Sequence, residues 1–119
     1  MDDNIDDYIN EELIYNIYNN SFSKFECLKE FINLIIDDLL NSIYEKNINK
    51  LNQIYIFIKD KIINLDKDDI FNEHINNKDL NFKYIELKNI FENIFNLNDI
   101  FDLNSNLPLL SHLLELLNN

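Results

Sequence analysis

The 119-residue sequence contains no Gly, Ala, Val, Thr, Arg or Trp, and it has one Pro and one Cys. Phosphate-binding loops and dinucleotide fingerprints need Gly where the backbone approaches a phosphate, so the absence of Gly excludes both. The single Cys excludes an intramolecular disulfide. Ile and Asn, whose codons are AT-rich, are very frequent among the amino acids that the sequence does use. This bias indicates an AT-rich genome and not a functional low-complexity tract.

Positive charge is scarce at both ends of the chain. Ten Lys stand against 22 Asp and Glu, which gives a net charge of -12. Residues 1–23 and 89–119 contain acids but no Lys, so all ten Lys lie between Lys24 and Lys88. Phosphate binding needs clustered Lys or Arg, and we expect no face of the fold to collect them. The sequence therefore predicts no direct binding of nucleic acid or of an anionic membrane.

Long apolar runs are also missing. None approaches the roughly 18 residues that a membrane span needs, and the acidic N-terminal residues do not resemble a secretory signal. We therefore expect a soluble intracellular protein with no membrane span, in the cytoplasm or the nucleus. The length suggests one domain over residues 1–119.

Residues 23–46 carry the clearest helical pattern. Ser23 and Glu26 have the spacing of a capping box, and Phe22 and Cys27 that of a hydrophobic staple. At about 100° per residue, the large apolar side chains cover half of the helix circumference: Phe25, Leu28, Phe31, Ile32, Ile35, Ile36, Leu39, Leu40 and Ile43. Such a wide face needs several partner helices. The sequence predicts an all-α fold, a single compact bundle of five to six helices around a long central helix at about residues 24–46.

The partner helices follow from the same periodicity. We predict a first helix over about residues 3–19, with a stripe of Ile5, Ile9, Leu13 and Ile17. A third helix over about residues 49–65 has a seam of Ile48, Leu51, Tyr55, Ile58, Ile62 and Leu65. Its run of residues 54–58 alone would suit a strand, but the flanking seam favours a helix.

Three more helices are predicted after the third. A short helix is expected over about residues 69–75. Asp79 then caps a helix to about residue 97, whose seam is Leu80, Tyr84, Leu87, Phe91 and Ile94. The last helix is expected to begin near Leu107, because Pro108 is tolerated in a first turn.

No motif for metal binding is complete, and we predict no cofactor. Asn64, Asp66 and Asp68 fit the first ligand positions of a calcium loop, but the required Gly and bidentate Glu are missing downstream. A solvated acidic turn is the simpler interpretation. Glu73 and His74 are adjacent, so they diverge around a helix and cannot be neighbouring ligands.

Catalytic residues are equally hard to assemble, and we predict that the protein is not an enzyme. Cys27 in a first turn would favour a thiolate, yet its spacing suits packing. Asp37 and Asp38 diverge, whereas an acid–base pair needs carboxylates that converge on one cleft. An enzyme site built from Cys27 with His74 or His112 is the least favoured alternative.

Several apolar residues lie outside the predicted core faces of their helices, and they indicate a protein interface instead. On the third helix, Phe57, Ile56 and Ile63 lie outside the main seam. On the last helix, Leu110, Leu114 and Leu117 are expected to serve the core, while Leu109 and Leu116, with Leu113, help to form an exposed docking patch. Two LxxLL patterns at residues 110–114 and 113–117 resemble the boxes of nuclear-receptor coactivators. Core packing is the favoured interpretation of both, because any Leu-rich amphipathic helix produces them.

The leading hypothesis is therefore a non-enzymatic interaction module, such as a small subunit, adaptor or modulator. It would bind another protein or a second copy of itself through an exposed apolar helical surface. The alternative is an acidic decoy that occupies the basic site of a nucleic-acid-binding protein, which the acidic ends of the chain motivate. Salt dependence separates the two, since decoy binding would weaken steeply with salt.

Overall fold

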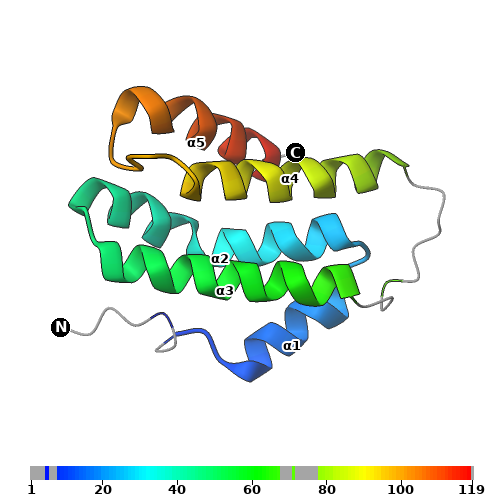
Figure 1. Ribbon diagram of the computed structural model, residues 1–119. Helices are drawn as coiled ribbons and strands as arrows, with labels where there is room; N and C mark the ends of the chain where they lie inside the picture. The colour runs from blue at the N-terminus through cyan, green and yellow to red at the C-terminus, as the bar shows by residue number, and fades with distance from the viewer. Residues whose placement is uncertain (1–4, 6–7, 68–70, 72–77, 119) are drawn as a thin grey trace.

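The computed structural model describes residue 5, residues 8–67, residue 71 and residues 78–118. These residues form five α-helices and no β-strand (Figure 1). The helices are α1 (Glu11–Asn20), α2 (Lys24–Glu45), α3 (Ile48–Lys67), α4 (Lys78–Phe95) and α5 (Leu103–Leu117). The predicted all-α bundle is confirmed. The predicted short helix over residues 69–75 lies almost wholly outside the described residues.

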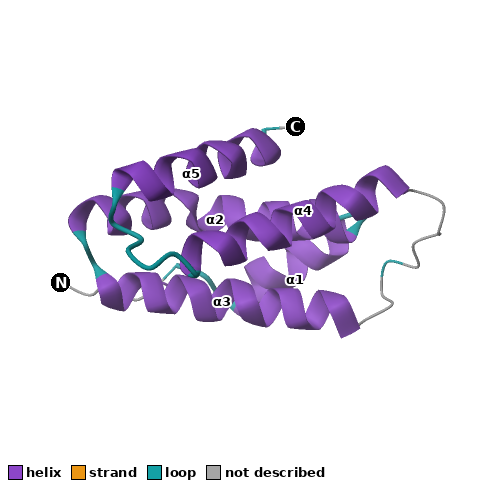
Figure 2. Ribbon diagram, turned by 45° about the horizontal axis from the view of Figure 1, so that its top comes forward, coloured by secondary structure: helices purple, strands orange, loops and turns teal. Residues whose placement is uncertain are grey.

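The central position of α2 is also confirmed. It packs against α1, α3 and α4, while α5 packs on α4. α2 and α3 run antiparallel as a hairpin, and α4 and α5 form a second antiparallel pair beside it (Figures 1 and 2). None of the helices in the described part of the chain is long and apolar enough to cross a membrane.

The predicted cap of α2 is present, but the staple is not. Ser23 Oγ accepts a hydrogen bond from the Glu26 backbone N–H at 3.0 Å. Glu26 Oε1 accepts one from the Phe22 backbone N–H at 2.8 Å. Phe22 is 86% exposed while Cys27 is fully buried, so the two side chains do not form the predicted staple. The Glu26 bond holds the Phe22 backbone beside the helix start, and the ring stays in solvent.

Three helices begin elsewhere than predicted. α4 begins at Lys78, so Asp79 lies within its first turn and does not cap it. In α1 and α5 an earlier or later side chain provides the cap. α1 starts at Glu11, since the Asn10 side chain accepts from the Leu13 backbone N–H at 2.9 Å. α5 starts at Leu103, since the Asp102 side chain accepts from the Asn104 backbone N–H at 3.3 Å. The earlier start places Pro108 inside α5 and not in its first turn.

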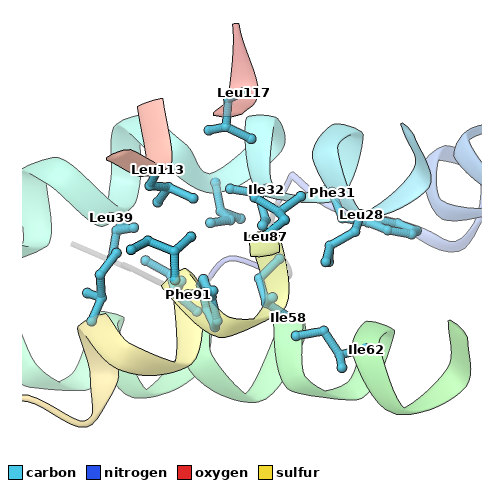
Figure 3. Close-up of a cluster of buried hydrophobic side chains, with 14 of the residues drawn as sticks. Leu28, Phe31, Ile32, Leu39, Ile58, Ile62, Leu87, Phe91, Leu113 and Leu117 are labelled. Carbon is cyan, nitrogen blue, oxygen red and sulfur yellow. The ribbon is translucent and has the colours of Figure 1, made fainter. Parts of the chain in front are cut away.

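Most of the predicted seam residues meet in one core (Figure 3). In α2 and α3 the fully buried side chains include Leu28, Phe31, Ile32, Ile35, Leu39, Ile58 and Leu65. Leu87, Phe91 and Ile94 join them from α4, and Leu113 from α5. The seam of α3 starts one turn later than predicted, because Ile48 at the helix start is 53% exposed.

Candidate functional site

The predicted docking patch on α5 is wrong for two of its three residues. Leu113 is fully buried and Leu116 is 5% exposed. Figure 3 shows Leu113 pointing into the cluster that also holds Leu39 and Phe91. Leu110 and Leu117 are buried as predicted, whereas Leu114 is only partly buried. The core therefore takes a wider face of α5 than the sequence suggests, because side chains of α5 join the buried cluster where this helix packs on α4.

Of the three interface residues predicted on α3, two are exposed and one packs against the core. Ile56 is 68% exposed and Ile63 is 42% exposed, as the sequence predicts. Phe57 instead packs at the edge of the core. Its ring meets Phe31 edge-on at a centroid distance of 6.0 Å, and the Lys61 ammonium lies 5.1 Å from its centre. A docking role for Ile56 and Ile63 stays a prediction.

Leu109 belongs to an open groove of about 530 Å³ between α4 and α5. The residues that line this groove are Phe82, Ile85, Glu86, Asn89, Ile90, Asn93, Leu109 and His112. Residues three and four apart share one face of a helix, so the α4 members form a continuous strip. This strip lies beside the face that α4 turns to the core.

Two of the apolar side chains that α4 contributes to the groove are exposed to solvent. Phe82 is 68% exposed and Ile85 is 40% exposed, whereas Ile90 is buried. Half-buried Leu109 adds an apolar side chain from α5. The sequence analysis does not identify Phe82 and Ile85 as candidate interface residues. The signal for both is that they are large apolar residues outside the seam of α4.

One polar pair spans the groove. His112 Nε2 on α5 lies 2.9 Å from Glu86 Oε2 on α4, and the two side chains are 42% and 48% exposed. Both groups stay accessible to solvent. The Glu86 carboxylate therefore places negative charge directly beside the apolar strip, where an incoming ligand would meet it.

The lining of the groove carries negative charge and no positive charge. No Lys lies among the lining residues. The sequence from residue 89 to residue 119 also lacks Lys and Arg, but it contains Glu92, Asp99, Asp102 and Glu115. Glu86 is the one charged residue among those that line the groove, so a ligand in the groove meets apolar side chains and a single carboxylate.

Among the described residues, the candidate catalytic groups are Cys27, Asp37, Asp38 and His112. Burial raises the pKa of Cys27 to about 12, so the thiol is protonated and a poor nucleophile at neutral pH. Asp37 is exposed, while Asp38 accepts a hydrogen bond from the Tyr8 hydroxyl. Within the described ranges, no group of three or more His, Cys, Asp or Glu residues is placed to hold a metal ion. Glu73, His74 and Asp68 lie outside those ranges.

Comparisons of the chain with protein-family models, with curated proteins and with solved structures found no match.

Proposed function

We propose that this protein is a non-enzymatic interaction module that binds a basic amphipathic helix of another protein in the groove between α4 and α5. The observation that carries the proposal is the exposure of Phe82 and Ile85 beside Leu109, in a groove without Lys. Exposed contiguous apolar side chains commonly mark interfaces.

The dimensions of the groove suit a helix. Its α4 wall extends from Phe82 to Asn93, which is about 16 Å at roughly 1.5 Å per residue. Three turns of a ligand helix have this length. Such a helix would present apolar side chains at intervals of three and four residues, as helix-in-groove ligands do.

The negative charge of the groove and of the chain favours a ligand helix that carries positive charge. The Glu86 carboxylate lines the groove and the chain carries a net charge of -12. Lys or Arg on the flanks of the ligand would complement this field and speed its encounter with the groove. A second copy of the chain would bring the same net charge of -12, so charge repulsion disfavours it as the occupant.

The acidic decoy is the less favoured alternative, because an apolar groove adds nothing to binding through charge alone. Salt separates the two mechanisms. Burial of Phe82 and Ile85 would survive a rise in ionic strength that screens exposed charges. Binding that disappears between about 50 and 300 mM salt would favour the decoy.

The test uses a fluorescein-labelled 18-residue peptide of Leu and Lys in an amphipathic helical pattern, followed by fluorescence anisotropy. The Phe82→Ala/Ile85→Ala variant should bind at least about tenfold more weakly, because truncating central apolar anchors costs more than about 1 kcal/mol. The matched control is Ile56→Ala/Ile63→Ala, which removes exposed apolar side chains from α3 and leaves the charge unchanged.

Circular dichroism should show that both variants remain folded. Equal loss of affinity in the two variants would contradict a specific groove. A larger loss of affinity in the α3 variant would indicate that the peptide binds at Ile56 and Ile63 instead.

A further inference from the structure

A histidine contacts the one carboxylate that lines the groove. His112 Nε2 on α5 lies 2.9 Å from Glu86 Oε2 on α4, and both side chains are accessible to solvent. The other lining residues are apolar side chains and two asparagines, Asn89 and Asn93. Histidine is the side chain whose charge ordinarily changes between about pH 5 and pH 8. The net charge of the groove therefore depends on whether His112 carries a proton.

A proton on His112 would change what the groove offers to a basic ligand. When the imidazole is neutral, the Glu86 carboxylate keeps its negative charge for a Lys or Arg of the ligand. When the ring is an imidazolium, His112 and Glu86 form an ion pair that has no net charge. The imidazolium also repels an approaching ammonium group. A basic ligand and a proton on His112 therefore compete for Glu86.

Two other charged residues lie one helical turn from this pair in the described part of the chain. On α4, the helix on which α5 packs, Lys83 precedes Glu86, and its ammonium nitrogen lies 5.8 Å from the centre of the Phe25 ring. On α5, the exposed residue Glu115 follows His112. Neither residue lines the groove. Lys and Glu side chains ordinarily change charge well outside the range of histidine, so the pH response of the groove is expected from His112.

We infer that His112 makes binding in the groove sensitive to pH, so that a basic helix binds at neutral pH and is released in mildly acidic solution. This inference rests on the proposed function, because it describes the regulation of the same groove. Coupling between two ligands is reciprocal. Since a proton on His112 weakens binding of the basic helix, binding of the helix must in turn expel a proton from His112.

The first measurement compares the affinity of the Leu/Lys peptide at about pH 7.5 and about pH 5.5, in about 50 mM salt to limit screening. A tetramethylrhodamine label replaces fluorescein, because the charge of fluorescein changes over this range. The wild-type protein should bind about three- to tenfold more weakly at the lower pH, because the attraction of one exposed carboxylate is offset and a repulsion is added. At about 300 mM salt the difference should shrink, since both effects are screened.

The chain has only two histidines, which provides a matched control. In His112→Gln the affinities at the two pH values should differ by less than about twofold, because the titrating contact is lost. His74→Gln should keep the full difference, although it removes the same change in net charge. His74 lies outside the described residues. Circular dichroism at both pH values shows whether the wild-type protein and each variant are folded.

The second measurement detects the expelled proton. Isothermal titration calorimetry at about pH 6.5, in buffers of different ionisation enthalpy, measures how many protons are released on binding. The wild-type protein and His74→Gln should release protons, and His112→Gln should not. Proton release by His74→Gln identifies His112 even if His112→Gln does not fold, because no other histidine remains.

Equal affinity of the wild-type protein at the two pH values would overturn the inference and leave the proposed function standing. A pH effect that is lost in His74→Gln and kept in His112→Gln would also overturn it, because the responding residue would be His74. Unfolding of the wild-type protein at about pH 5.5 would do the same, because loss of the fold would then explain the release. If the peptide binds the wild-type protein at neither pH, the proposed function fails and the inference fails with it.

Discussion

Glu86 on α4 and His112 on α5 contact each other across the groove, with 2.9 Å between Oε2 and Nε2. The two side chains are about half exposed, and exposed ion pairs contribute only about 0–1 kcal/mol to stability. The pair is therefore not what holds α5 on α4. Buried side chains such as Leu113 and Phe91 do that. The carboxylate is available to a ligand instead.

The first prediction concerns Glu86. Glu86→Gln should weaken binding of the Leu/Lys peptide several-fold and reduce its dependence on salt, because one carboxylate facing the basic ligand is lost. The free energy of unfolding should change by less than about 1 kcal/mol. Glu45→Gln at the exposed end of α2 is the control with the same charge change. If the two variants bind the peptide alike, Glu86 has no specific role.

The second prediction separates two leucines that lie seven residues apart on α5. Leu116→Glu should unfold the protein, because Leu116 is 5% exposed and a buried unpaired carboxylate is very costly. Leu109→Glu should leave the protein folded but weaken peptide binding, because half-buried Leu109 lines the groove. Urea denaturation and anisotropy together measure both effects. A folded Leu116→Glu variant would contradict the position of α5.

The third prediction concerns the start of α5. Pro108→Ala should raise the free energy of unfolding by about 1–3 kcal/mol, because Pro108 lies inside the helix and Pro is disfavoured there. A helix that began near Leu107 would have Pro108 in its first turn, where Pro is favoured. A neutral or destabilising Pro108→Ala would therefore support the later start and count against Asp102 as the cap.

The fourth prediction concerns alkaline pH. Burial raises the pKa of Cys27 from 9.0 to about 12, and burial together with Asp38 raises the pKa of Tyr8 above its usual 10.0. Above about pH 9 the unfolded chain loses protons that the native protein keeps, so stability must fall as the pH rises. Urea denaturation at about pH 8 and about pH 10.5 should show the decrease.

The variant Cys27→Ala/Tyr8→Phe removes both groups and should lose less stability over the same pH interval. An equal decrease in this variant and in the wild type would assign the effect to other groups. Cys27 in the native protein should also resist thiol reagents, since the thiolate is the reactive form.

The sequence is informative where a pattern is local. The period of α2 and the Ser23 cap follow from side-chain spacing, and both are present. The starts of α1 and α5 cannot be predicted from side-chain spacing in this way. Asn10 and Asp102 cap these helices, but polar residues beside them in the sequence could cap equally well. Periodicity locates a helix better than it locates the helix ends.

The candidate sites could be predicted only in part, because they depend on packing between distant segments. The sequence predicts an interface role for Leu109, but the residues that line the groove with it, Phe82 and Ile85, come from another helix. Leu116 was placed with Leu109, since an amphipathic pattern does not show how much of an apolar arc the core will take.

Docking in the groove is tested most directly by an NMR titration of the isotope-labelled protein with the Leu/Lys peptide at about 150 mM salt. Exposed charges are screened at this ionic strength, so apolar contact should dominate the changes in chemical shift. Binding in the groove predicts the largest shifts at Phe82, Ile85 and Leu109. The largest shifts at Ile56 and Ile63, or shifts spread over the acidic surface without a maximum at the groove, would contradict it.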